Sequence, residues 1–347
     1  MESNQTNGNI TVNDTLWRGV KEPMFPDEPP ELIIARVLFA LLVSVALVFN
    51  LLLLLAVVRR RKTVHVIYCF TAAMIIPDLI FYCKLVAELM DWDALYPSWS
   101  ENGTSCAFWQ YGSHIYPIMH SVILCAIVYH AFITLFLDYS GGYEENCRKY
   151  FFLILGAILI TIGFLVAPSG IYSQVKTPSG QDDILRSHFK QYCGLDVPSL
   201  IVNEKDVSGI KEESEASFRL VYEIVLPYVL PIAFLVFPYI SLLIGLMRNV
   251  PAASHSEYST KMTVVATLWL LTSYLMLHVS SVMRNMFSIF SVWHRLIALF
   301  DAYDDERVPI FQTYIHILSY VLTCIWAILR PALCFKYNLR LRRALGP

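Results

Sequence analysis

The chain has 347 residues, of which 56% are hydrophobic and 16% are charged, and its formal net charge is −2. Soluble globular domains carry about 25% charged residues, so this composition excludes an ordinary water-soluble domain and a disordered chain. Without a basic excess there is no electrostatic footprint for nucleic acid, and we expect no nucleic-acid partner. The composition therefore predicts a polytopic membrane protein.

Long apolar runs predict an all-α protein with seven membrane-spanning helices. A transmembrane helix needs about 20 mostly apolar residues, and the runs here are continuous rather than alternating, which favours helices over an outer-membrane barrel. The stretch from Asn285 to Phe300 is interrupted by charged residues, so we interpret it as an extension of the sixth helix plus a loop; an eighth span is the alternative. The predicted spans are residues 33–58, 66–90, 107–137, 151–173, 218–247, 262–283 and 310–335.

The distribution of charge predicts the orientation in the plasma membrane. Cytoplasmic loops are rich in Lys and Arg, and the first span is followed by four consecutive basic residues, Arg59 to Lys62. We therefore expect an extracellular tail over residues 1–31, a bundle over 32–335, and a short cytoplasmic tail helix over 336–347. Four glycosylation sequons fall on the predicted outside, at Asn4, Asn9, Asn13 and Asn102.

Two of the eight cysteines lie on the predicted outside, where disulfides persist. Cys106 stands at the start of the third span, and Cys193 lies in the long loop that precedes the fifth. A bond between them would hold this loop across the mouth of the bundle. Two free thiols are the alternative.

Several residues stand at characteristic places in the spans. They are Asn50 in the first, Asp78 in the second, Trp109 after Cys106, Pro168 in the fourth, Pro231 and Tyr239 in the fifth, and the segment Leu341 to Leu345 after the seventh. With the seven spans and the cysteine pair, they resemble the rhodopsin-like (class A) G-protein-coupled receptors over residues 32–347. The resemblance implies a receptor that couples an extracellular ligand to a heterotrimeric G protein or arrestin, with a short amphipathic helix after the seventh span.

The third span departs from the family at its inner end. Counted from Cys106, the family's Asp-Arg-Tyr triplet falls at His130–Phe132, so that Ala131 stands where the family has the arginine that meets the G protein. This difference favours a second hypothesis, a receptor-shaped scavenger or scaffold that does not signal.

The sixth and seventh spans also depart from the family's motifs. The Cys-Trp-Leu-Pro motif aligns with Ser273–Met276, so that Tyr274 takes the tryptophan's place. The Asn-Pro-x-x-Tyr motif aligns with Arg330–Cys334 and keeps only Pro331. A second register, over Ser319–Ile325, is the alternative.

Charged residues inside a membrane are costly and usually pair or line a cavity. In the family, the residues that match Asp78 and Arg330 border a water-filled site that can hold sodium, and His120 stands where a serine is common. Either Asp78 keeps a cation site or Arg330 replaces the cation; extension of Arg330 to the inner interface is the alternative. Together with Asn50, these residues form a predicted buried polar switch.

Further polar and aromatic side chains suggest a ligand site near the outer end. Glu223, one turn inside the fifth span, is placed to contact a cationic ligand group, and an interfacial glutamate in water is the alternative. The other side chains are equally compatible with packing or helix–helix hydrogen bonds. The predicted ligand residues are Ser113, His114, Glu223, Tyr274, His278, His316 and Tyr320.

Two features of the family that are missing here narrow the possible classes of ligand. Ser113 occupies the position where amine receptors of the family carry an acidic residue, and the seventh span has no lysine to bind retinal. The charged loop over residues 174–216 favours a peptide over a small lipid, although it is equally compatible with a solvated loop. We expect no cofactor and no metal.

Other classes of membrane protein are less well supported. A transporter or channel subunit would show broken helices or inverted repeats, and the sequence shows neither. An intramembrane protease needs a Gly-x-Ser-Gly element and a zinc hydrolase needs clustered histidines, so we do not expect an enzyme.

Overall fold

The computed structural model describes residues 30–60, 64–89, 104–137, 142–176, 192–195, 217–248, 257–289 and 307–344. Nearly all of this part is helical, and seven helical segments are long and apolar enough to cross a membrane. This confirms the prediction of a nearly all-helical, multi-pass membrane protein with seven spans. The segments are Val37–Arg60, Val66–Val86, Cys106–Phe136, Phe151–Ile171, Ser217–Met247, Lys261–Met286 and Ile317–Tyr337.

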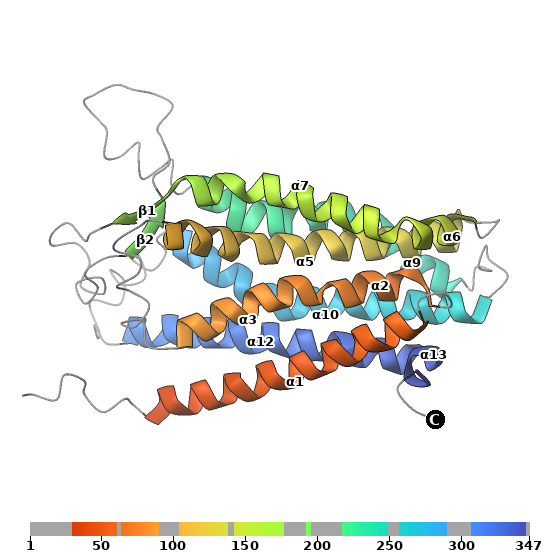
Figure 1. The fold of residues 1–347 in the computed structure, drawn as a ribbon, viewed down its shortest axis with the longest axis horizontal. Coiled ribbons are helices and arrows are strands. Elements are labelled where there is room, and N and C mark those ends of the chain that lie inside the picture. The colour runs from red at the N-terminus through yellow and green to blue at the C-terminus, as the bar shows by residue number, and fades with distance from the viewer. Residues whose placement is uncertain are drawn as a thin grey trace, which may run out of the picture.

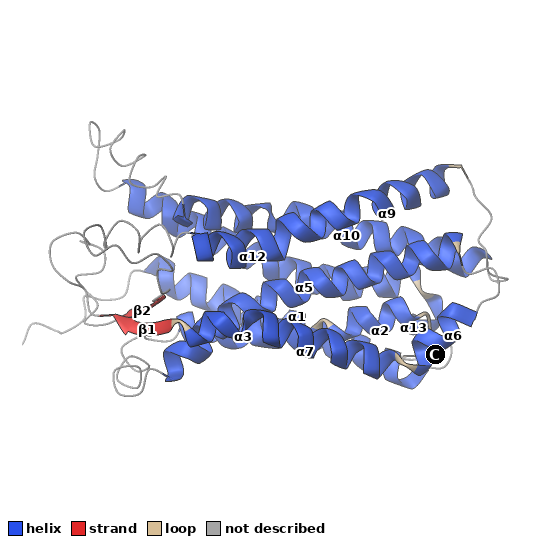
Figure 2. Cartoon of the chain, turned by 90° about the horizontal axis from the view of Figure 1, so that it is seen from above, coloured by secondary structure: helices blue, strands red, loops and turns tan. Residues whose placement is uncertain are grey.

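The long helices run back and forth between two ends of the bundle (Figures 1 and 2). One end carries the strands β1 and β2, and the other carries the short helices α6 and α13; we call them the β-sheet end and the α13 end. The elements are α1 Pro30–Arg60, α2 Val66–Ala73, α3 Ile75–Leu89, α5 Thr104–Phe136, α6 Gly142–Lys149, α7 Phe151–Ile171, β1 Ser173–Lys176, β2 Tyr192–Leu195, the π-helix η1 Val221–Val229, α9 Leu230–Met247, α10 Glu257–Ile289, α12 Arg307–Tyr337 and α13 Leu339–Arg342.

The second span is broken into α2 and α3 at Met74, where the sequence predicted one continuous helix. Pro77 explains the break. It has no N–H to donate to the carbonyl of Ala73, four residues earlier, and its ring clashes with that carbonyl. Helical bonding resumes at once, because Asp78 N–H donates to the Met74 carbonyl at 3.2 Å. The irregular turn therefore lies directly beside the buried aspartate.

The fifth span contains a nine-residue π-helix, η1, which the sequence analysis did not anticipate. Pro227 lies inside it, and Pro231 follows it at the start of α9. Each proline removes an ordinary helical hydrogen bond, and Leu230 N–H donates instead to the carbonyl of Val225, five residues earlier. Segments of π-helix are rare and are frequent at functional sites. Glu223 lies in this segment.

The core of the bundle lies around α5. This helix contacts α2, α3, α7, η1, α9 and α10, and its buried apolar residues join those of the neighbouring helices in one cluster that includes the fully buried Trp326. The outer surface of the bundle is apolar, as expected of a surface in contact with lipid: α1, α7 and α9 expose many large apolar side chains. A bundle with a packed interior and an apolar exterior is what a membrane environment requires.

The connecting segments add elements that the sequence did not predict. β1 and β2 pair antiparallel, with Val175 opposite Cys193. At the α13 end, α12 continues to Tyr337, and only the four residues of α13 follow as helix, so the expected tail helix over 336–347 is shorter in the described part. Asn338 caps α13 by accepting hydrogen bonds from the backbone N–H groups of Arg340 and Leu341.

Candidate functional site

Four polar residues from four helices meet inside the bundle, and we call them the central cluster: Asn50 of α1, Asp78 of α3, His120 of α5 and Arg330 of α12. One Asp78 carboxylate oxygen, Oδ2, accepts a hydrogen bond from Arg330 Nη2. The other, Oδ1, lies 2.8 Å from His120 Nε2. Because an ionised carboxylate only accepts hydrogen bonds, Nε2 is the donor in this contact. Both oxygens of the aspartate are therefore paired.

Asn50 completes the central cluster from the other side. Its Oδ1 accepts a second hydrogen bond from Arg330 Nη2, and its Nδ2 donates to the carbonyls of Ala46, at 2.8 Å, and Ala327, at 3.0 Å. The bond to Ala327 ties α1 to α12, one turn before Arg330. The asparagine side chain thus fixes both the arginine and the helix that carries it.

Burial decides between the alternatives that the sequence left open for Arg330. Its exposed fraction is 0%, and that of Asp78 is 2%, so the arginine does not extend to the interface but lies against the aspartate. A charge in a protein interior carries a desolvation cost of several kcal/mol unless it is well paired. The ion pair that the sequence suggested is therefore present; its role as a switch stays a prediction.

Trp326 packs against the central cluster and was not identified from the sequence. The Arg330 guanidinium carbon lies 4.9 Å from the centre of the indole ring, within the range of cation–π attraction. The ring also packs edge-on against His120 at 5.3 Å, Tyr274 at 5.3 Å and His278 at 5.4 Å. The signal in the sequence was the spacing of four residues to Arg330, which places both side chains on one face of α12.

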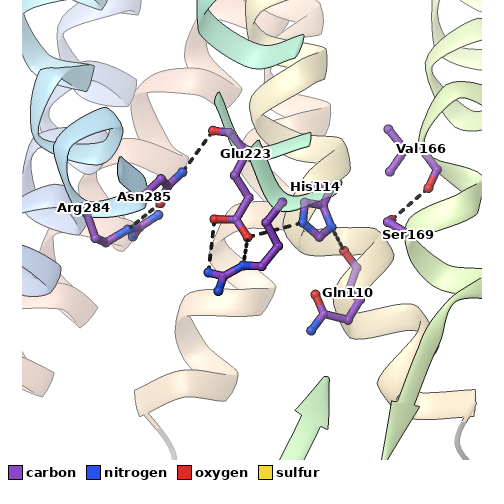
Figure 3. Close-up of polar contacts among 8 residues, drawn as sticks. Gln110, His114, Val166, Ser169, Glu223, Arg284 and Asn285 are labelled. Carbon is purple, nitrogen blue, oxygen red and sulfur yellow. Dashed lines mark hydrogen bonds and ion pairs between the residues drawn. The ribbon is translucent and has the colours of Figure 1, made fainter. Parts of the chain in front are cut away.

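A second polar group, which we call the β-end cluster, lies nearer the β-sheet end and consists of His114, Arg219, Glu223, Arg284 and Asn285. Figure 3 shows Glu223 between His114 of α5 and Asn285 of α10. Its Oε1 lies 2.9 Å from Arg219 Nε and 3.8 Å from His114 Nε2. The Glu223 carbonyl accepts a hydrogen bond from Asn285 Nδ2 at 3.2 Å. Contacts from α5 and α10 therefore converge on this residue of η1.

The remaining contacts of the β-end cluster orient its side chains. His114 Nδ1 lies 2.8 Å from the Gln110 carbonyl, and because a carbonyl only accepts, Nδ1 carries the proton. Arg284 donates through Nη1 to Ser319 Oγ at 3.0 Å and through Nε to Asn285 Oδ1 at 3.1 Å. The bond to Ser319 connects α10 to α12. The cluster is thus anchored in four elements, α5, η1, α10 and α12.

The predicted ligand residues divide between the two clusters rather than forming one site. His114 and Glu223 come together in the β-end cluster, and Tyr320 lies beside it, with its ring 5.3 Å from the Arg284 guanidinium carbon. Tyr274 and His278 stack on each other at 4.2 Å and line the central cluster through Trp326. Ser113 is half-buried beside His114. The side chain of His316 and the four sequon asparagines lie outside the described residues.

Three members of the β-end cluster were not predicted from the sequence, namely Arg219, Arg284 and Asn285. A signal existed for the first: Arg219 and Glu223 are four residues apart, the spacing at which opposite charges meet on a helix. Arg284 directly precedes the stretch that was interpreted as an extension of the sixth helix. Its hydrogen bond to Ser319, 35 residues away, depends on how α10 and α12 pack.

At the α13 end, the position of the family's arginine is buried. Ala131 is 1% exposed and belongs to the main apolar cluster. The neighbouring His130 is also buried, and its ring lies 5.1 Å from that of Tyr143 in α6. This part of α5 therefore packs against the chain itself.

The cysteines separate into two groups. Cys106 is buried at the start of α5. Six others in the described part are free thiols. The side chain of Cys193, in β2, lies outside the described part, so its pairing with Cys106 stays a prediction.

No protein-family model matches the chain, and no curated protein is similar to it in sequence.

Proposed function

We propose that the chain is a seven-helix receptor of the plasma membrane, of the kind that the rhodopsin-like G-protein-coupled receptors represent. The β-sheet end faces outside and binds the ligand, for which a peptide is favoured, and the α13 end faces the cytoplasm and meets a heterotrimeric G protein or arrestin. The basic residues around the α13 end, including Arg59, Arg60, Arg342 and Arg343, support this orientation.

The central cluster is the observation that carries the proposal. It joins α1, α3, α5 and α12 through a buried ion pair and its hydrogen bonds. Because a buried charge is costly without its partner, the helices cannot slide past one another continuously. They move between discrete arrangements in which the pair is either made or broken, and a ligand that prefers one arrangement shifts the population towards it.

Packed side chains connect the two clusters. On α10, Asn285, Ser281, His278 and Tyr274 follow one another at helical spacing, and on α12 the same spacing relates Ser319, Thr323, Trp326 and Arg330. Arg284 bonds to Ser319 at the end of these rows nearer the β-sheet end. His278 and Tyr274 pack on Trp326 further towards the α13 end. This continuity supports coupling between the clusters, and only a measured coupling energy establishes it.

A second function is favoured by one observation at the α13 end. Ala131 is buried and uncharged at the position where the family presents its arginine. A protein of this shape that binds its ligand without recruiting a G protein, as a scavenger or a scaffold, agrees with that substitution.

The deciding experiment measures basal recruitment of a panel of G proteins and arrestins in cells, at matched surface expression. We compare the wild type with Asp78→Asn and with Thr161→Ala, an exposed α7 residue whose hydroxyl bonds only within its own helix. Allosteric coupling energies correspond to changes of about 5- to 150-fold, so we expect Asp78→Asn to alter recruitment by at least the lower value and Thr161→Ala to leave it unchanged.

The variant His130→Asp with Ala131→Arg separates the two functions. If the rest of the machinery is intact, restoring the family's residues raises recruitment above the wild-type level. If the wild type, Asp78→Asn and this double variant all stay at the level of untransfected cells, the signalling proposal is rejected and the scavenger or scaffold function is favoured.

A further inference from the structure

Arg219 holds the Glu223 carboxylate in a geometry that a ligand can reproduce. The guanidinium reaches both oxygens, with Nε 2.9 Å from Oε1 and Nη2 3.5 Å from Oε2. This fork is the arrangement by which arginine recognises carboxylates. The arginine is the more exposed partner, at 29% against 19% for the glutamate side chain. The carboxylate is therefore the inner partner and the guanidinium the outer one.

The Arg219–Glu223 pair lies within one helical segment. Its two residues lie four apart on the same helical segment, so the pair connects no two helices, and partly exposed pairs of this kind contribute little to stability. The position of Glu223 is set by other contacts, namely the bond from Asn285 of α10 to its carbonyl and the packing of η1. These contacts hold the backbone of Glu223 independently of the guanidinium.

His114 contacts the same carboxylate from α5. Because its Nδ1 proton is donated to the Gln110 carbonyl, Nε2 is the atom that faces Glu223 Oε1, and their separation of 3.8 Å is longer than a hydrogen bond. Next to Glu223, Tyr222 packs on Phe218 at 4.4 Å and on His114 at 5.9 Å, and its hydroxyl donates to the Leu165 carbonyl of α7. The Glu223 carboxylate already pairs with one guanidinium and therefore favours a cationic ligand group.

From these contacts we infer that the ligand presents a guanidinium group, as in an arginine side chain, to Glu223, and that Arg219 is the intramolecular stand-in that it displaces. Displacement exchanges one guanidinium for another at the same two oxygens, so the charge at the carboxylate is unchanged. The contact made by Arg219 therefore competes with the ligand and lowers its apparent affinity. This inference rests on the proposed receptor function, since it names the ligand chemistry of the same site.

The test uses purified full-length protein in lipid nanodiscs and Nα-acetyl-arginine amide as the probe, with binding followed by ligand-observed NMR over a concentration series. The neutral isostere Nα-acetyl-citrulline amide and the ammonium compound Nα-acetyl-lysine amide are the comparison probes. We expect the arginine probe to bind the wild type and the citrulline probe not to bind. Equal binding of the lysine probe would reject the assignment to guanidinium.

Two substitutions of opposite sign sharpen the test. Glu223→Gln should weaken binding of the arginine probe by about tenfold or more, the factor that corresponds to a hydrogen bond with a charged partner. Arg219→Gln should strengthen it by about twofold, because it removes the guanidinium that competes for the carboxylate in the i,i+4 pair. Arg248→Gln, at the opposite end of the same span, is the matched control and should leave binding unchanged.

The outcomes separate this inference from the proposed function. If Glu223→Gln does not fold, Glu223→Asp, which keeps the charge and shortens the side chain, should still bind and should weaken the probe. Equal binding to the wild type, the Glu223 variant and Arg219→Gln would overturn the inference, as would no binding to any of them. Guanidinium binding without recruitment of any G protein or arrestin would reject the receptor function and leave the ligand assignment standing.

Discussion

Arg330 is a charged residue inside a membrane-type bundle, and its burial is stabilised by specific partners. A fully buried guanidinium inside an apolar bundle is expensive, and the structure compensates it with the Asp78 carboxylate, the Asn50 side-chain oxygen and the face of Trp326. Each partner comes from a different element or from the preceding turn of the same helix. The charge therefore links helices that apolar packing alone would leave free to adjust.

The first prediction is that Asp78 and Arg330 are energetically coupled. Removing one partner leaves an uncompensated buried charge, so Asp78→Asn and Arg330→Gln should each lower the free energy of unfolding by about 3–5 kcal/mol. The double variant leaves no charge unpaired and should cost clearly less than the sum of the two. Thermal unfolding in detergent measures all three, with Thr161→Ala as a control outside the cluster.

Coupling is the quantity that decides this prediction. If the losses of the two single variants simply add in the double variant, the side chains do not act as a pair, whatever their distance. A wild-type protein that is stabilised by sodium more than by potassium would also argue against the arginine as a replacement for a bound cation.

At the scale of elements, irregular positions determine where the functional residues lie. The second span is interrupted at Met74, one turn before Asp78, and η1 changes the turn of the fifth span around Glu223. Elsewhere in the fifth span, a glycine allows two helices to approach each other closely. This approach occurs at the α13 end, where Gly245 of α9 faces Phe136 of α5.

A second prediction tests this close approach. A Cβ atom at Gly245 would lie 2.7 Å from Phe136 Cζ, so Gly245→Ala must shift one helix or the ring and should cost about 1–3 kcal/mol of stability. At Gly156 of α7, a Cβ atom would meet nothing within 4 Å among the described residues, and Gly156→Ala should not destabilise. Thermal unfolding of both variants is the measurement; equal effects would mean that α9 and α5 can separate at this point without cost.

A third prediction concerns a disulfide bond that we expect between the start of α5 and β2. Peptide mapping without reduction should recover Cys106 linked to Cys193, and Cys106→Ser should lower stability by about 2–5 kcal/mol, the usual range for a native disulfide. Cys83→Ser, at an exposed free thiol, is the control and should have little effect. Recovery of Cys193 as a free thiol in surface-expressed protein would refute the pairing.

At the scale of the whole molecule, the basic residues and the sequons predict how the seven-helix bundle is oriented in the membrane. The short connections at the α13 end carry basic residues, among them Arg59, Arg60, Lys149 and Arg248, and the sequons belong to segments that connect to the β-sheet end. Because short positively charged loops stay in the cytoplasm, the β-sheet end should be extracellular.

The fourth prediction tests this orientation in intact cells. Treatment with a glycosidase should increase the electrophoretic mobility of the wild type, and replacing Asn4, Asn9, Asn13 and Asn102 by Gln should abolish that shift. An epitope tag fused after Pro347 should be accessible to antibody only when the cells are permeabilised. Labelling of the tag on intact cells would reverse the assigned topology and, with it, the proposed ligand side.

The membrane class and the number of spans could be predicted from the amino-acid sequence, because about 20 consecutive apolar residues can be satisfied only by a helix across lipid. The sequence also singled out Asp78, Arg330 and Glu223, since charged residues are conspicuous within such runs. Which charges meet could be learned only from the folded bundle. Asp78 and Arg330 are 252 residues apart in the chain, and only the packing of α3 beside α12 chose pairing over extension to the interface.

The same limit explains why the predicted ligand residues divide between two clusters. Whether Tyr274 and Glu223 share a site depends on their depth along different helices. Helical periodicity gives the face on which a residue lies, whereas the relative axial position of two helices comes from how their side chains pack.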